Sequence, residues 1–121
     1  MPDAIGFIVE FAIKDGRLDA FKDVITTMTA TVEKTEPGAL SYRWFLSPDD
    51  TVCTIHEWYA GDDAVLAHFT GEAVANHMGA LLAESGINSF HVYGTPGEKA
   101  ASILSNLPVT VTHTLAAGFA R

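Results

Sequence analysis

The sequence has few basic residues, a single cysteine and no long apolar run. Seven Lys and Arg against fifteen Asp and Glu give a formal net charge of −8 over 121 residues. Such a surface repels phosphate groups, so we expect neither nucleic acid nor a membrane as a partner. The lone Cys53 excludes an internal disulfide, and no apolar stretch reaches the roughly 18 residues of a membrane-spanning helix. The start, Met-Pro-Asp-Ala, lacks signal-peptide features, which predicts a cytoplasmic protein.

Patterns that bind metals or nucleotides are also missing. His56, His91 and His113 fall on different predicted elements, without His-x-His or Cys–His spacing. The glycine-containing stretch 94–97 fits neither a phosphate-binding nor a dinucleotide-binding loop. We therefore expect no bound metal and no organic cofactor.

What the sequence does have is a large apolar share for its size. Hydrophobic residues make up 48% of the chain, which suits one domain over residues 1–121, with a core at 4–94 and an extension at 95–121. A share this high in so small a domain indicates a second buried surface, and hence a partner.

The spacing of apolar residues predicts an α+β fold. Residues 5–14 alternate as in a strand, with Phe7, Val9 and Phe11 on one face, whereas residues 18–35 repeat every three or four positions as in a helix. Further segments are a hairpin (39–47 and 51–60), two helical stretches (64–69, with Asp62 or Asp63 as N-cap, and 72–84) and a strand (89–93). The order β-α-β-β-α-β is that of the ferredoxin-like antiparallel sheet.

The C-terminal extension predicts one more helix and one more strand. Residues 98–106 are helical in pattern, and residues 109–115 alternate after Pro108, which suits an edge strand. Because the preceding fold is already complete, we expect this strand to lack a free neighbour in its own sheet and to pair across a dimer.

The two faces of the hairpin depend on how its strands pair. A loop centred on residues 48–50 pairs Leu46 near Val52. One face then carries the aromatic set Tyr42, Trp44, His56 and Trp58, and the other carries Arg43, Phe45, Glu57 and Tyr59. The aromatic face suits a dimer interface better than a substrate-stacking wall, because Trp and Tyr are enriched at interfaces.

Two local motifs resemble the antibiotic-biosynthesis-monooxygenase family. Residues 36–42, Glu-Pro-Gly-Ala-Leu-Ser-Tyr, are similar to the family's Glu-Pro-Gly entry to the second strand. Residues 57–68 resemble its Glu-x-Trp, acidic, Ala and Ala-His pattern, and end at His68. The resemblance covers residues 5–94. Tyr59 stands where the family usually has Trp, and the Pro-His-Phe that often follows the His is absent.

The resemblance implies a homodimer, a dimeric α/β barrel in which two sheets face each other, with a small-molecule cavity in each subunit. It further implies a cofactor-independent monooxygenase that uses molecular oxygen on a small aromatic, phenolic or quinol-like substrate. Two alternatives stay open, a non-catalytic dimeric module that binds small ligands and a haem-degrading oxygenase.

The candidate site residues follow from the motifs and the hairpin. His68 is the candidate base, because a histidine near neutral pH can take a phenolic proton. Arg43 is the candidate cation that steadies the resulting anion, oriented by Glu57, while Tyr59 or Trp58 positions the ring. Phe45 and His77 complete the candidate substrate-binding set. His77 lies one residue from the position at which haem-degrading relatives have their axial histidine. A structural Arg43–Glu57 ion pair and a core His68 are the competing interpretations.

Overall fold

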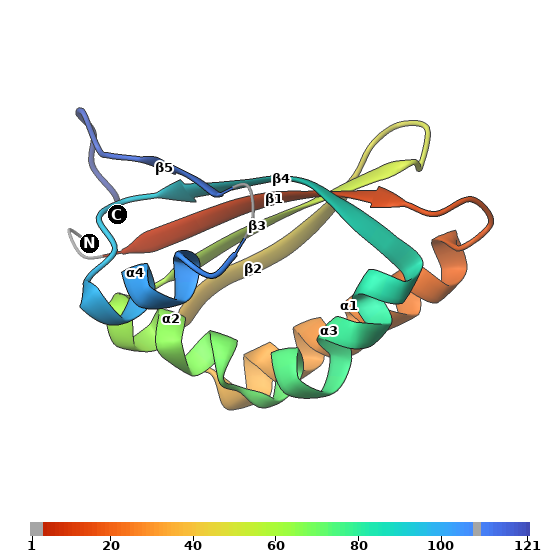
Figure 1. The fold of residues 1–121 in the computed structure, drawn as a ribbon, viewed down its shortest axis with the longest axis horizontal. Coiled ribbons are helices and arrows are strands. Elements are labelled where there is room, and N and C mark those ends of the chain that lie inside the picture. Colours follow the sequence, from red (N-terminus) through yellow and green to blue (C-terminus); the bar gives the residue numbers. More distant parts are fainter. Residues whose placement is uncertain (1–3, 108–109) are drawn as a thin grey trace.

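The computed structural model describes residues 4–107 and 110–121 (Figure 1). The expected start of the last strand, Pro108 and Val109, and the first three residues lie outside the described residues. The elements are, in order, β1 (Ile5–Ile13), α1 (Leu18–Thr35), β2 (Ala39–Leu46), β3 (Val52–Tyr59), α2 (Asp62–Phe69), α3 (Glu72–Glu84), β4 (Ser85–Tyr93), α4 (Glu98–Leu104) and β5 (Thr110–His113).

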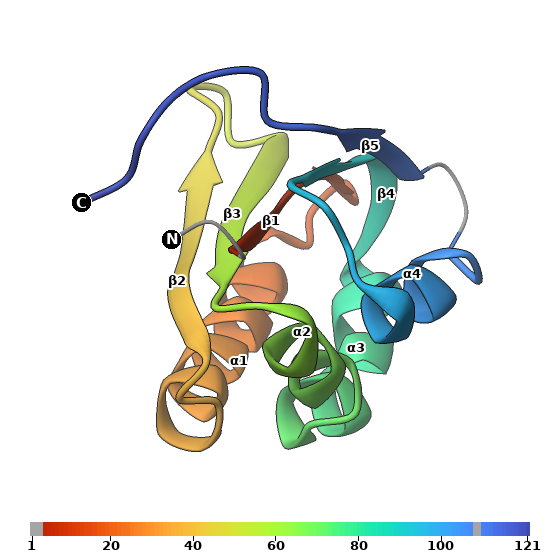
Figure 2. The same ribbon diagram turned by 90° about the vertical axis from the view of Figure 1, so that its left-hand side faces the viewer.

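The strands form a mixed sheet with helices on one side. Among the described residues the sheet has five strands in the order β2-β3-β1-β4-β5. The pairs among the first four strands are antiparallel, and β5 lies parallel to β4. The helices cover one face and leave the other open in this chain (Figure 2). The predicted ferredoxin-like α+β fold is confirmed.

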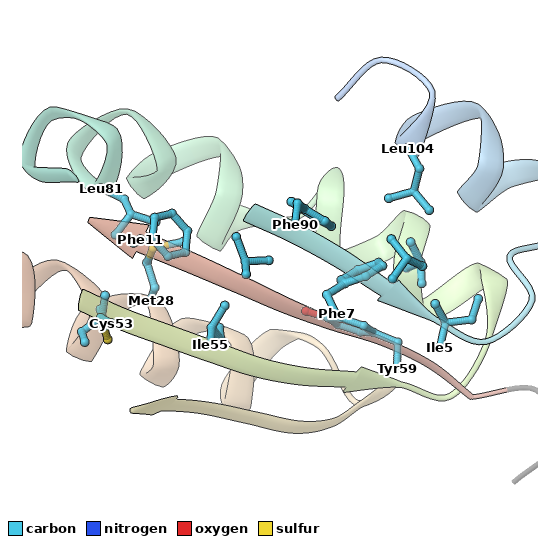
Figure 3. Close-up of a cluster of buried hydrophobic side chains, with 14 of the residues drawn as sticks. Ile5, Phe7, Phe11, Met28, Cys53, Ile55, Tyr59, Leu81, Phe90 and Leu104 are labelled. Carbon is cyan, nitrogen blue, oxygen red and sulfur yellow. The ribbon is translucent and has the colours of Figure 1, made fainter. Parts of the chain in front are cut away.

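The core lies between the sheet and the helices that cover it. Helix α1 contributes one apolar stripe, Phe21, Ile25, Met28 and Val32, all buried as its spacing predicts. The alternating residues of β1, among them Phe7 and Phe11, point into the same layer (Figure 3). Cys53 is completely buried in this layer, and burial raises the pKa of its thiol to about 11, so it behaves as a small apolar side chain.

The hairpin register differs from the predicted one by one residue. Leu46 pairs with Cys53 rather than near Val52, and Ser47 N–H donates to the Val52 carbonyl. The Asp49 side chain accepts hydrogen bonds from the Ser47 hydroxyl and from the Thr51 backbone and hydroxyl, which fixes this longer loop. A shift of one residue moves every side chain of a strand to the other face.

The predicted faces of the hairpin are therefore wrong. Tyr42 pairs with Glu57 and Trp44 with Ile55, so these four lie on the helix-covered face. Arg43, paired with His56, and Phe45, paired with Thr54, lie on the open face together with Trp58. The aromatic set of the sequence prediction is divided between the two faces, and Arg43 does not share a face with Glu57.

The C-terminal strand also differs from expectation. We expected it to lack a neighbour in its own sheet, but β4 is an edge strand in the order β2-β3-β1-β4 and has a free side. β5 occupies that side, with residues 110–113 pairing with residues 90–93. The imidazoles of His91 and His113 are hydrogen bonded at 2.8 Å across this pair.

The starts of β4 and α2 differ from the predicted ones. β4 begins at Ser85, directly after α3, rather than at residue 89. α2 begins at Asp62 itself and has no side-chain N-cap. The Asp62 carboxylate instead accepts hydrogen bonds from the backbone N–H groups of Lys99 and Ala100, and so caps α4.

None of the helices in the described part of the chain combines the length and apolarity that crossing a bilayer requires.

Candidate active site

Glu36 enters the interior because the next residue is proline. Pro37 disfavours helical geometry at the residue before it, and Glu36 has left the helix with φ −124° and ψ 81°. Its backbone N–H still donates to the Val32 carbonyl, but its side chain is buried, with 5% of the residue exposed. The sequence Glu-Pro thus places a buried carboxylate at the residue that follows α1.

Gly38 allows α2 to come close to this carboxylate. A Cβ atom at Gly38 would lie 2.7 Å from the Cβ of Ala64, closer than any real contact. Ala64 and His68 are four residues apart on α2 and therefore share a face of the helix. The missing side chain at Gly38 and the small one at Ala64 together bring His68 up to the end of α1.

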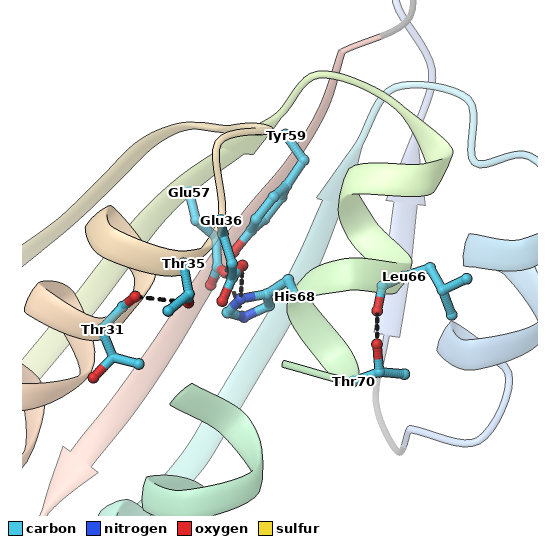
Figure 4. A network of polar contacts seen from close by, with 8 residues as sticks. All are labelled: Thr31, Thr35, Glu36, Glu57, Tyr59, Leu66, His68 and Thr70. Atoms are coloured by element: carbon cyan, nitrogen blue, oxygen red, sulfur yellow. Dashed lines mark hydrogen bonds and ion pairs between the residues drawn. The ribbon is translucent and has the colours of Figure 1, made fainter. Parts of the chain in front are cut away.

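His68 lies between two buried glutamates. Its Nδ1 is hydrogen bonded to Glu36 Oε1 at 2.9 Å, and its Nε2 is 3.4 Å from Glu57 Oε1 (Figure 4). The Tyr59 hydroxyl donates a hydrogen bond of 2.5 Å to the same Glu57 oxygen. Glu57 and Tyr59 come from β3, two residues apart on its helix-covered face. Three elements, the end of α1, β3 and α2, therefore build a Glu36–His68–Glu57–Tyr59 chain of polar contacts, here called the acid–base cluster.

Three groups of the cluster, His68, Glu57 and Tyr59, have pKa values raised above their ordinary ones. Burial opposes a charge on His68, but the hydrogen bond to Glu36 and the charges of Glu57 and Glu36 outweigh it and raise the pKa of His68. Burial also raises the pKa of Glu57, although His68 and the Tyr59 hydrogen bond oppose that shift. Burial, together with the charge of Glu57, raises the pKa of both Tyr59 and Tyr42. A proton delivered to His68 is thus stabilised by two carboxylates.

A small cavity adjoins the cluster. It has a volume of about 50 Å³ and is walled mainly by apolar side chains from the sheet and from α1, α2 and α3. The polar groups that line it belong to His68, Glu57, Tyr42 and Trp44. Ionisable side chains beside a mainly apolar cavity mark this place as a candidate active site.

The structure brings together only some of the predicted site residues. His68 and Glu57 line the cavity, and Tyr59 contacts both, with its ring 5.0 Å from that of His68. The carboxylate of Glu57 meets His68 rather than Arg43. The expectation that Glu57 orients Arg43 is therefore wrong, for the register reason given above.

The remaining predicted residues lie elsewhere in this chain. Arg43, Phe45 and Trp58 are on the open face of the sheet, and the Arg43 guanidinium lies 5.3 Å from the centre of the Phe45 ring. His77 is on α3, where the next residue, Met78, lines the cavity instead. One residue rotates a side chain by about 100° around a helix. Within residues 4–107 and 110–121, no three His, Cys, Asp or Glu side chains are grouped to hold a metal ion.

Two residues of the site were not predicted as such. Glu36 appeared in the sequence only as part of a motif that ends a helix, and its proximity to His68 depends on tertiary packing. Tyr42 was assigned to the opposite face, but its ring lies 6.0 Å from that of His68. The signal that could have found Glu36 is an acidic residue directly before Pro-Gly, at the point where the proline ends the helix.

The structure is thus that of a small ferredoxin-like α+β protein with a buried acid–base cluster between the sheet and its helices. Residues 4–79 match the family described as antibiotic biosynthesis monooxygenase. The chain belongs to this family. A search among curated proteins found no match.

Solved structures agree in fold. MupZ from Pseudomonas fluorescens is 22% identical, with a TM-score of 0.81, and the match covers 98% of this chain and 95% of MupZ. SnoaB from Streptomyces nogalater, a cofactor-independent oxygenase, is 19% identical, with a TM-score of 0.68, covering 78% of this chain and 95% of SnoaB. A conserved protein from Methanosarcina mazei Go1 is 16% identical, with a TM-score of 0.66, covering 76% and 92%. The match to MupZ includes the C-terminal extension.

Proposed function

We propose that this protein is a cofactor-independent monooxygenase that acts on a small aromatic substrate with a phenolic hydroxyl. The observation that carries the proposal is His68, a buried imidazole between two carboxylates at the wall of an apolar cavity. The family and the likeness in fold to SnoaB, a cofactor-independent oxygenase, support the reaction type.

The cluster supplies the proton transfer that such a reaction needs. His68 takes the phenolic proton, and Glu36 and Glu57 stabilise the imidazolium that forms. The phenolate is then electron-rich enough to react with O₂ at a ring carbon that bears hydrogen. One oxygen atom forms the new C=O bond, and the other leaves as water with the two hydrogens that the substrate loses. The substrate supplies all four electrons that reduce the two oxygen atoms, so no external reductant is required.

The test is oxygen uptake with naphthols and hydroxyanthrones as substrates. We expect uptake by the wild type, incorporation of one ¹⁸O atom per product from ¹⁸O₂, and loss of at least about 100-fold in rate for His68→Gln, the usual scale of a general base. His77→Gln is the matched control, since His77 is absent from the cavity lining, and it should keep the rate. No substrate-dependent uptake, or an equal rate in His68→Gln, would refute the mechanism.

We also propose that two copies pair through their open sheet faces. On this face Phe45 is 45% and Trp58 is 36% exposed, and Trp58 lies against Gly6, where a Cβ would come within 2.7 Å of the indole ring. An exposed aromatic surface on the open face of the sheet suits a second copy of the same surface. Trp58→Glu should shift a dimer to monomer in sedimentation analysis, whereas Leu82→Glu, at a similarly exposed position on α3, should not. A monomeric wild type would refute this arrangement.

One observation favours a second candidate function, ligand binding without catalysis. A groove of about 420 Å³ runs between α1 and β2, outside the cavity that His68 lines. Binding in this groove requires no proton transfer. Under air, such a protein would return a stabilising naphthol chemically unchanged, and His68→Gln would bind it as the wild type does.

A further inference from the structure

Two hollow spaces meet at one pair of side chains. The groove between α1 and β2 is lined on the helix side by Ile25, Thr26, Thr29, Ala30 and Glu33. On the strand side it is lined by Tyr42 and Trp44, which also line the cavity at His68. These two residues, here called the Tyr42–Trp44 wall, separate the surface groove from the acid–base cluster.

The indole N–H of Trp44 is buried and makes no hydrogen bond of ordinary geometry, although it lies close enough to the Tyr42 hydroxyl to oppose the rise in that group's pKa. Buried indole N–H groups usually find a partner, so this unpaired donor is unusual. The ring is held by neighbouring aromatic rings, with centroids 5.5 Å from Phe11, 6.1 Å from Phe21 and 5.8 Å from Tyr42. These contacts orient the indole, and its N–H is a buried donor without a well-formed hydrogen bond.

The sizes of the two spaces indicate what that acceptor belongs to. A cavity of about 50 Å³ is too small for an aromatic ring, since benzene occupies an apolar cavity of roughly 150 Å³. An aromatic ligand can reach His68 only if the Tyr42–Trp44 wall moves and joins the cavity to the groove of about 420 Å³. The faces and edges of the Tyr42 and Trp44 rings favour a flat aromatic ligand at that place.

We propose that Trp44 is a ligand-binding residue whose indole N–H donates to an oxygen of a planar aromatic ligand, either a phenolic oxygen or a ring carbonyl. The ligand lies across the Tyr42–Trp44 wall, with one edge in the groove and the other at His68. An indole can only donate, so the ligand must supply the acceptor at this point. The inference rests on the proposed function for the reaction at His68, but the binding step does not depend on it.

The experiment compares two ligands that differ by one oxygen, 1-naphthol and naphthalene, without oxygen so that no turnover occurs. Equilibrium dialysis, read by ligand fluorescence, gives the dissociation constants. We expect the wild type to prefer 1-naphthol by about 3- to 10-fold, the usual contribution of one neutral hydrogen bond. Trp44→Phe should reduce this preference and keep its affinity for naphthalene, while Trp58→Phe, a control outside the cavity lining, should retain the wild-type preference. An equal preference in Trp44→Phe and the wild type would overturn the proposal.

A second measurement uses the unaltered protein, in case Trp44→Phe does not fold. The chain has two tryptophans, so its NMR spectrum contains two indole N–H signals, which Trp58→Phe assigns. The Trp44 signal should move downfield with 1-naphthol and not with naphthalene, and an unmoved signal would overturn the proposal. If the wild type prefers 1-naphthol but no substrate causes oxygen uptake, the binding role of Trp44 is supported and the proposed oxygenase activity is refuted. If oxygen uptake is observed but the preference for 1-naphthol is absent, only the proposed role of Trp44 is refuted.

Discussion

The contact between Glu36 and His68 should be measurable as a coupling energy. The change is a double-mutant cycle of Glu36→Ala, His68→Ala and the double variant, with unfolding free energies measured by urea denaturation. Both residues are about 95% buried and their hydrogen bond is 2.9 Å long, so water screens it little. Cavities left by each substitution occur in both arms of the cycle and cancel to first order.

The expected magnitude follows from the charge on His68. A buried hydrogen bond to a charged partner contributes about 1.5–3 kcal/mol, whereas one between neutral groups contributes about 0.5–1.5 kcal/mol. We therefore expect a coupling of about 1.5–3 kcal/mol at pH 6, which decreases as the pH rises through the raised pKa of His68 and the imidazole becomes neutral.

The control cycle pairs His68→Ala with Glu33→Ala. Glu33 is an exposed glutamate three residues before Glu36, so its removal deletes the same charge without deleting a contact to His68. Its coupling should stay below about 0.5 kcal/mol. A Glu36–His68 coupling that is equally small at pH 6, or one that increases with pH, would refute the assignment of the two as a buried charged pair.

Three further predictions concern pH dependence and packing. The pKa values of His68 and Glu57 are raised in the folded chain. Their stabilising contributions are therefore complete below the ordinary pKa values of 6.5 and 4.5 and are lost as the pH rises. The unfolding free energy should fall from pH 6 to pH 9, and a rise over this range would contradict the prediction. Gly38→Ala should destabilise by about 1–3 kcal/mol because the new methyl meets Ala64, and Ala64→Gly in the same chain should recover part of that loss in thermal unfolding. Asp62→Ala should remove the cap of α4, reduce stability by about 0.5–2 kcal/mol and speed amide hydrogen exchange in residues 98–104, with unchanged exchange as the contrary result.

The elements of this fold could be predicted from the sequence because their signals are local. The stripe of α1 and the alternation of β1 each identify one element and one buried face, and the structure confirms both. The family motifs could also be read, since Glu-Pro-Gly and Ala-His are short. Their physical role appears only in three dimensions, where Gly38 and Ala64 let Glu36 meet His68.

The hairpin register could not be predicted, for a reason specific to β2 and β3. Register is well specified when one face of a strand is apolar and the other polar. Here both faces carry large apolar or aromatic residues, so a shift by one position leaves the pattern almost unchanged. The choice is made by the loop, where Asp49 accepts three hydrogen bonds and Asp50 has φ 61°. Neither feature can be recognised from hydrophobic spacing.

That single residue of register decides which chemistry the site can perform. With the predicted pairing, a cation, Arg43, would neutralise Glu57, and His68 would stand apart. With the observed pairing, Glu57 faces His68 without a permanent positive charge at its side, and the imidazolium becomes the cation that compensates both carboxylates. A site of this kind stabilises a proton that arrives from a ligand, and it gains that ability because Arg43 is on the other side of the sheet.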